Sequence, residues 1–185
     1  MSKTGLRIFF SLIYLAGVLY LLLPSPATPN LGTDLQSDEP GDTWQHPEQK
    51  AFFTNKNRSM VLLEMQRNFS LYFKDIRIPS YRLNYRPEEV GTLVRDQLRS
   101  YYLEEIVYPL RESLFVSGWE PQNSPIYKGY LPKDRPRVII DNIEYLSKVT
   151  IRPVRSRPIS RLFVWTLCFP ALYLVYRSFK SLNHV

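Results

Sequence analysis

The sequence predicts an α+β fold in which a small extramembrane domain lies between an N-terminal and a C-terminal transmembrane helix. Uncharged apolar runs occupy residues 8–23 and 162–176, at opposite ends of the 185-residue chain. Positive charge flanks each run, with Arg7 before the first and Arg161 and Arg177 around the second. Helical and strand periodicities alternate in the polar segment between the runs, which predicts helix, strands, long helix and antiparallel strands in that order.

The first apolar run, residues 8–23, spans about 24 Å as a helix, against a hydrocarbon core of about 30 Å. Residues 1–7 contain basic side chains, whereas no Lys or Arg follows the run before Lys50. The positive-inside bias therefore places residues 1–7 in the cytoplasm. The run also resembles a cleavable signal peptide that ends at Ala27. We favour an uncleaved signal anchor because prolines crowd that cleavage position.

The second apolar run, residues 162–176, is shorter and contains Pro170. A proline inside a helix removes a backbone hydrogen bond and bends the helix. A span this short needs flanking residues, a thinner bilayer or a partner helix. A helix lying in the interface is the alternative, but this run lacks the polar face that such a helix requires. We therefore expect an integral membrane protein with two spans, both termini cytoplasmic and the central domain extracytoplasmic.

The net charge of +7 is compatible with nucleic-acid binding, because basic chains attract phosphates. Its distribution favours lipid headgroups instead, since the basic side chains flank a hydrophobic run. The predicted partners are the lipid bilayer and a membrane-protein partner or a second copy of the chain, with no nucleic acid. The predicted membrane-surface basic cluster contains Arg152, Arg155, Arg157, Arg161, Arg177 and Lys180.

The basic juxtamembrane segment 156–161 conflicts with this orientation, because it would lie outside the cytoplasm while the basic tail 177–185 lies inside. The opposite orientation would instead place the basic side chains of residues 1–7 outside. We take the first signal as dominant, because the positive-inside rule weakens once a long domain has been translocated.

Residues 24–50 are rich in Pro, Asp, Thr and Ser and contain few large apolar residues. Such a composition cannot bury enough apolar surface to offset the entropy of ordering the chain. We therefore predict an acidic, Pro-rich flexible linker over residues 24–50, which holds an α+β domain of residues 51–155 off the membrane. Trp44, near the end of the linker, is a candidate to dock on the domain.

The first part of the domain is predicted as a helix followed by strands. Apolar residues recur at helical spacing over residues 60–69, with Asn55 or Asn57 as the N-cap. Residues 74–85 alternate between apolar and polar positions, which predicts one or two strands interrupted at Pro79.

A long helix is predicted over residues 87–106. Pro87 and the two glutamates that follow it suit the first turn of a helix, and they open an apolar stripe at helical spacing. Pro109 should end or kink this helix.

The last part of the domain is predicted as β structure. Residues 114–116 lead into a Ser-Gly turn at residues 117–118. Residues 138–140 and 145–154 are predicted as two paired strands joined near the Asp-Asn pair at residues 141–142.

Residues with catalytic or metal-binding chemistry are sparse. His46 lies in the predicted linker and His184 in the tail, so neither is expected in a rigid pocket where it could act as a general base. The single cysteine, Cys168, lies in the second apolar run, and no GxSxG, HExxH or CxxC pattern occurs. We therefore predict no catalytic residue, no metal site and no cofactor. The predicted function is that of a non-enzymatic accessory or scaffold component that acts by protein–protein interaction.

Two other classes of function stay open. An aromatic loop with Trp119, Tyr127 and Tyr130 as its ligand-binding residues would make the domain a peptide-binding or glycan-binding module. A carboxylate-dependent hydrolase would need two acids facing one cleft. The candidate acids are Glu104, Glu105, Glu112 and Glu120.

Overall fold

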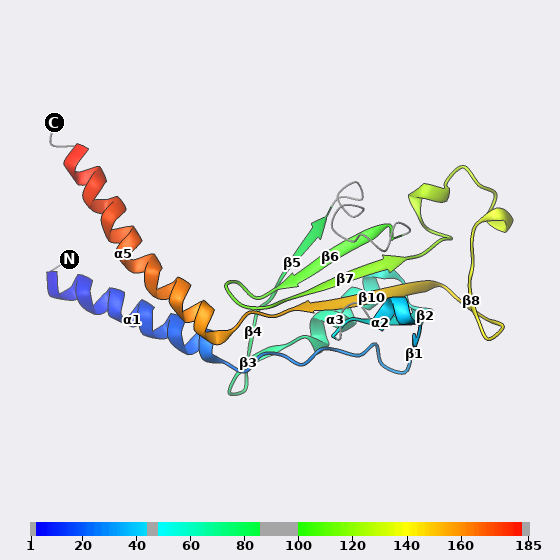
Figure 1. Ribbon diagram of the computed structural model, residues 1–185, viewed down its shortest axis with the longest axis horizontal. Coiled ribbons are helices and arrows are strands. Elements are labelled where there is room, and N and C mark those ends of the chain that lie inside the picture. Colours follow the sequence, from blue (N-terminus) through cyan, green and yellow to red (C-terminus); the bar gives the residue numbers. More distant parts are fainter. Residues whose placement is uncertain (1–2, 44–47, 86–99, 183–185) are drawn as a thin grey trace.

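The computed structural model consists of an N-terminal helix, a sheet domain and a C-terminal helix, and it describes residues 3–43, 48–85 and 100–182 (Figure 1). The helices α1 (Lys3–Leu22) and α5 (Pro158–Leu182) leave the same end of the domain. This arrangement confirms the predicted α+β class with a helix at each end.

A six-stranded antiparallel sheet forms the centre of the domain, with the strand order β1-β2-β10-β7-β6-β5. The strands β7 and β10 are its longest and lie side by side at the centre. Strand β10 leads directly toward α5 (Figure 1). The strands are β1 (Leu35–Gln36), β2 (Lys50–Thr54), β5 (Tyr81–Tyr85), β6 (Tyr102–Val107), β7 (Ser113–Trp119) and β10 (Ser147–Val154).

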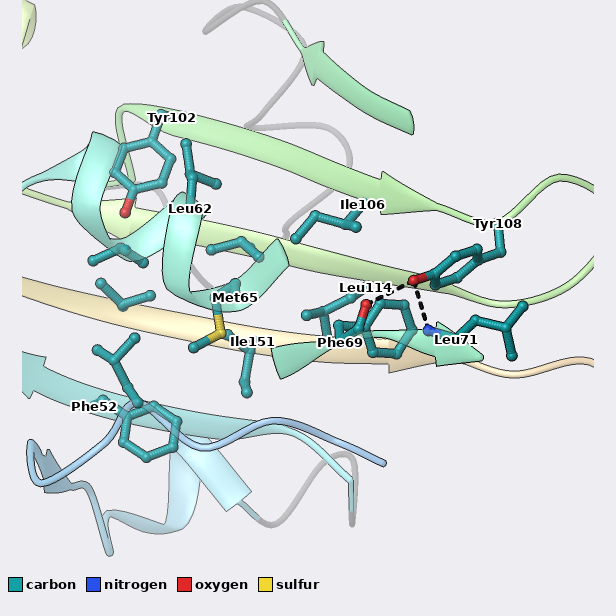
Figure 2. Packing of buried hydrophobic residues seen from close by; sticks show 14 residues of the cluster. Phe52, Leu62, Met65, Phe69, Leu71, Tyr102, Ile106, Tyr108, Leu114 and Ile151 are labelled. Atoms are coloured by element: carbon teal, nitrogen blue, oxygen red, sulfur yellow. Dashed lines mark hydrogen bonds between the residues drawn. The ribbon is translucent and has the colours of Figure 1, made fainter. Parts of the chain in front are cut away.

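Helix α3 (Arg58–Asn68) covers one face of this sheet. It begins at Asn57, whose side-chain oxygen accepts a hydrogen bond from the Met60 amide at 3.0 Å. This cap satisfies one of the free N–H groups of the first turn and confirms the predicted helix and its N-cap. The helix packs onto inward-facing residues of the strands (Figure 2). The resulting core contains Leu31, Phe52, Val61, Leu62, Met65, Phe69, Leu71, Tyr102, Ile106, Tyr108, Leu114, Val116, Val149 and Ile151.

Strands β4 (Ile76–Ile78) and β5 lie on either side of Pro79, as the alternation predicted. Strand β4 forms a hairpin with β3 (Leu71–Phe73), which follows α3 and was not predicted. The buried Tyr108 fastens this hairpin to the sheet. Its hydroxyl accepts a hydrogen bond from the Leu71 amide and donates one to the Phe69 carbonyl, both at 2.9 Å (Figure 2). Burial raises the pKa of Tyr108, so the hydroxyl keeps the proton that it donates.

The strand pairing expected near the end of the domain was wrong. Strand β8 (Val138–Ile140) pairs with a short β9 (Ile143–Tyr145), whereas β10 pairs with β2 and β7. The turn between β8 and β9 lies at the expected Asp141 and Asn142, whose φ angles of 49° and 63° suit a tight two-residue hairpin. Such a turn pairs β8 with the residues immediately after it. Two short helices, η1 (Pro125–Tyr127) and η2 (Pro132–Asp134), lie in the preceding loop.

The long helix predicted over residues 87–106 was wrong at its C-terminal end. Residues 86–99 lie outside the described part of the chain, and the following residues form strand β6. In β6 the side chains of Tyr102, Glu104 and Ile106 share one face with period two, and all three are buried. Tyr102 and Ile106 also fit helical spacing, which is why periodicity alone could not separate the two structures. Pro109 lies in the turn between β6 and β7 rather than at a helix end.

The turn predicted at residues 117–118 was also wrong, because strand β7 continues through both of them. Gly118 is opposite Tyr102 in the sheet, and a Cβ at this position would overlap the tyrosine ring. The glycine therefore accommodates a buried ring and does not bend the chain.

The segment predicted as a flexible linker instead lies against the domain over its described residues. Leu31 is fully buried in the core, and β1 pairs with β2. Lys148 binds Asp42 at 2.8 Å and Glu39 at 3.0 Å. Burial alone would lower the pKa of Lys148, but these two hydrogen bonds raise it above its ordinary value. The acidic residues of this segment thus pair with lysines of the domain. The segment also adds β1 to the edge of the sheet, and its composition does not indicate that pairing.

The short helix α2 (Pro40–Thr43) follows β1 in this segment, and the described chain resumes at residue 48. Trp44 and His46 lie outside the described residues, and so does His184.

Both terminal helices are long and apolar enough to cross a membrane, over Thr4–Leu22 and Pro158–Ser181. Only 6% of the most apolar stretch of each helix is buried inside the protein. Low burial separates them from the core helix of a soluble protein. The second helix extends beyond the apolar run at residues 162–176, so it is longer than the sequence suggested. Two such helices are consistent with a membrane protein.

Candidate functional site

Two arginines and a glutamate form a buried ion cluster where α1 and α5 meet the domain. The Glu112 side chain is 1% exposed, the Arg111 side chain 0% and the Arg161 side chain 2%. One carboxylate oxygen of Glu112 accepts from Arg111 at 2.8 Å, and the other accepts from Arg161. Ser25 adds a hydroxyl hydrogen bond to Glu112 at 3.1 Å. We call Arg111, Glu112 and Arg161 the junction triad.

Arg111 also caps the C-terminal end of α1. Its guanidinium donates to the carbonyl oxygens of Tyr20 at 2.7 Å and Leu23 at 2.8 Å. The last carbonyls of a helix lack partners within the helix and form the negative end of its dipole. A cation at this position is therefore stabilised twice, by hydrogen bonds and by the dipole. The Tyr20 hydroxyl closes the contact by donating to the Pro109 carbonyl at 2.9 Å.

Arg161 connects α5 to the same carboxylate. It lies in the first turns of that helix, where the dipole disfavours positive charge. Glu112 offsets that cost, and Arg161 also donates to the hydroxyl oxygen of Ser156 at 2.7 Å and to its carbonyl oxygen at 2.6 Å. Ser156 in turn donates to the Arg111 carbonyl at 3.0 Å. The β6–β7 turn, the end of α1 and the start of α5 are thus joined by one hydrogen-bonded network.

Close packing between the two helices continues outward from the junction triad. Gly17 of α1 faces Trp165 of α5, and a Cβ at this glycine would overlap the indole ring. The indole N–H donates to the Tyr14 carbonyl at 3.2 Å, and the Tyr14 ring meets Phe169 edge to face at 5.3 Å between centroids. Small residues that permit close approach, together with hydrogen bonds between helices, are how helices associate in lipid. The two helices diverge with distance from the domain, toward the N-terminal half of α1 and the C-terminal half of α5 (Figure 1).

A second buried polar group lies near the opposite end of the sheet, around Glu120. Its carboxylate accepts from the Tyr101 hydroxyl at 2.9 Å and from Asn123 at 3.2 Å. Burial and this carboxylate together raise the pKa of Tyr101 and of the adjacent Tyr102, so both phenols stay protonated. Within the described residues, the Tyr102 hydroxyl and the Oε1 atom of Glu120 have no hydrogen-bond partner.

The structure separates the four candidate acids. Glu104 and Glu105 are successive residues of β6 and point to opposite faces of the sheet. Glu104 is held by Arg58 and Arg82, Glu105 accepts from Tyr85, Glu112 belongs to the junction triad, and Glu120 lies beyond the far end of β7.

The three proposed ligand-binding aromatics lie in two places. Tyr127 and Tyr130 meet edge to face in the loop after β7, with ring centroids 6.0 Å apart. Trp119 ends β7 and is opposite Lys148 of β10. The described residues contain no cluster of three or more His, Cys, Asp or Glu side chains suited to hold a metal.

The basic cluster predicted at the membrane surface divides into exposed and buried members. Arg152, Arg155, Arg157, Arg177 and Lys180 are exposed, whereas Arg161 is buried in the junction triad. Sequence reasoning missed Arg111 and considered Glu112 only as an acid for catalysis. A hairpin assignment for residues 102–119 would have placed the adjacent Arg and Glu in a turn, but their partner Arg161 lies far along the chain.

Comparison of the chain with protein-family models, curated proteins and solved structures found no significant match.

Replacement of Glu112 by Gln should lower the free energy of unfolding by about 3–5 kcal/mol, because it leaves two buried arginines without a counter-charge. Chemical denaturation in detergent micelles, followed by circular dichroism, measures the loss. Glu144→Gln is the matched control, because Glu144 pairs with Arg137 at 3.3 Å on the surface, where a pair contributes at most about 1 kcal/mol. Equal effects of the two substitutions would contradict a structural role for the junction triad.

Proposed function

We propose that the chain is an integral membrane protein whose helices α1 and α5 cross the bilayer as an antiparallel pair. The observation that carries the proposal is that two apolar helices leave the same end of the domain (Figure 1). Only 6% of the most apolar stretch of each helix is buried. Their side chains are largely uncovered, with Leu12 at 61% and Leu172 at 63% exposure. Apolar surface of this extent is costly in water and favourable in lipid.

The orientation follows from charge, with both termini in the cytoplasm and the domain outside it. The basic side chains of Lys3 and Arg7 lie in the first turns of α1, and no Lys or Arg follows the helix before Lys50. The arginines at the start of α5 favour the opposite orientation, but two of them have acidic partners. Arg161 shares the carboxylate of Glu112 with Arg111, and Arg155 pairs with Glu48 at 2.7 Å. Arg157 is left as an exposed arginine at this boundary.

Within the membrane, we propose that the divergent halves of the two helices contact another membrane protein or a second copy of the chain. Exposed rings and aliphatic side chains line both of these halves, including Phe9 of α1 and Tyr176 of α5. Pro170 also cannot donate a hydrogen bond to the Thr166 carbonyl, which a polar group on a neighbouring helix could satisfy. This need for a neighbour supports an accessory or scaffold role in a membrane assembly.

A non-enzymatic role is the simplest proposal for the domain. It is supported by the engagement of Glu104 and Glu112 with arginines, because acids held in this way are not available for proton transfer. Ligand binding at the aromatic loop stays a hypothesis, since Tyr127 and Tyr130 pair with each other in that loop.

Cysteine accessibility in intact bacterial cells tests the orientation. In a Cys168→Ser background, a cysteine in place of Tyr130, which is 57% exposed on the domain, should react with a membrane-impermeant maleimide. A cysteine in place of Ser2 should react only after the cells are permeabilised. Reaction of the domain cysteine only after permeabilisation would contradict the orientation, and recovery of the chain in the soluble fraction without detergent would overturn the two-span proposal.

Purification of the full chain in a mild detergent tests the proposed assembly role. We expect a species larger than one chain plus its micelle, measured by light scattering coupled to size-exclusion chromatography. Alanine substitution of Tyr173 and Tyr176 on the divergent half of α5 should reduce that mass. The matched control is alanine at Tyr81 and Tyr130, which are similarly exposed on the domain. A strictly monomeric protein without partners would count against the assembly role.

A further inference from the structure

The β3–β4 hairpin lies at the end of the domain from which α1 and α5 emerge (Figure 1). Two hydrogen bonds fix its position relative to α1. Tyr108 accepts from the first amide of the hairpin, at Leu71, and the adjacent Pro109 accepts from Tyr20 at the end of α1, both at 2.9 Å. The hairpin and the membrane-side helix are therefore held by neighbouring residues of one turn.

An apolar stripe runs from the core to the tip of this hairpin. Leu71 and Ile78 are directly opposite each other, with Leu71 buried and Ile78 packed against the core. The next pair on the same face is Phe73 and Ile76, which are 42% and 69% exposed. The stripe thus continues beyond the protein interior, and its last pair is exposed on the surface of the domain.

The tip also carries groups that suit a headgroup region. Tyr72, on the other face, is 51% exposed and is an amphipathic ring. Lys74 and Asp75 form the turn, and Arg77 is opposite Tyr72. The net charge of the tip is therefore positive, which favours the phosphates of lipid headgroups.

We propose that the tip of the β3–β4 hairpin inserts into the lipid interface as a third contact with the membrane. The inference rests on the proposed two-span arrangement, because the ends of α1 and α5 set the level of the bilayer surface. Lipid is the occupant because the hairpin lies at the end of the domain from which both helices emerge, and its tip combines exposed apolar side chains with a net positive charge. Leu110, 56% exposed in the β6–β7 turn, lies at the same end and adds to this contact.

Depth-dependent fluorescence quenching of the full chain tests the inference. A cysteine in place of Ile76, in the Cys168→Ser background, carries the fluorophore NBD, and the protein is reconstituted into phosphatidylcholine and phosphatidylglycerol vesicles. We expect blue-shifted emission and stronger quenching by a nitroxide near the top of the acyl chain than by one near its end. Tyr72→Cys gives a second position on the same tip and should behave alike.

The β8–β9 hairpin provides the matched control, because Ile139 is also exposed, at 54%, and lies at the opposite end of the domain (Figure 1). A probe at Ile139 should show no quenching, and a probe at Leu12 of α1 should be quenched inside the hydrocarbon. An unquenched hairpin tip with a quenched Leu12 probe would overturn this inference alone. A Leu12 probe without quenching would overturn the two-span proposal as well, and equal quenching at Ile76 and Ile139 would show non-specific adsorption and overturn the insertion.

Discussion

The buried carboxylate of Glu112 is the interaction on which the rest of this structure depends. It binds Arg111 and Arg161, and through them it joins the turn of the β6–β7 hairpin to both terminal helices. Two cations share one anion, and the helix carbonyls at Tyr20 and Leu23 balance the excess positive charge. Because all three side chains are almost fully buried, each depends on the others to avoid an uncompensated charge. The junction is therefore expected to behave as a unit.

In the two-span proposal, this junction determines how the domain is held relative to the membrane. A flexible linker would let the domain move freely above the bilayer, whereas the junction triad and the packed segment before β2 fix the domain relative to α1. If α1 and α5 cross the bilayer as proposed, a fixed domain presents one defined end to the lipid, the end at which the β3–β4 hairpin lies. The opposite end, with Glu120 and the loop after β7, then faces away from the membrane. Partners in the membrane would meet the divergent helix halves, and partners outside it would meet that far end.

Sequence patterns predicted the elements whose structure depends mainly on residues close together in the chain. The two apolar runs became α1 and α5, Asn57 became the cap of α3, and the Asp141-Asn142 pair became a hairpin turn. Strand β6 could not be predicted in the same way, because Tyr102 and Ile106 fit helical spacing and the strand depends on pairing with β5 and β7. The segment before β2 looked unable to fold because its composition is polar. It gains its order from Leu31, which is buried in a core supplied by distant parts of the chain.

The junction triad lay beyond sequence reasoning for the same reason. Arg161 followed a basic segment beside an apolar run, which is the usual pattern of a headgroup contact. Nothing in its neighbours indicates that Glu112, distant along the chain, neutralises it. The same holds for Trp165 of the second apolar run, which packs against Gly17 of the distant α1. Buried contacts between distant residues can be read only when the topology is known.

The distance between the domain and α1 in lipid tests this account most directly. Spin labels at Leu63 on α3 and Leu15 on α1, which are 70% and 56% exposed, can be placed without disturbing the core. Double electron–electron resonance in vesicles should give one narrow distance distribution, and Glu112→Gln should broaden it. A distribution that is already broad with Glu112 intact would show that the domain is tethered loosely and would contradict the account.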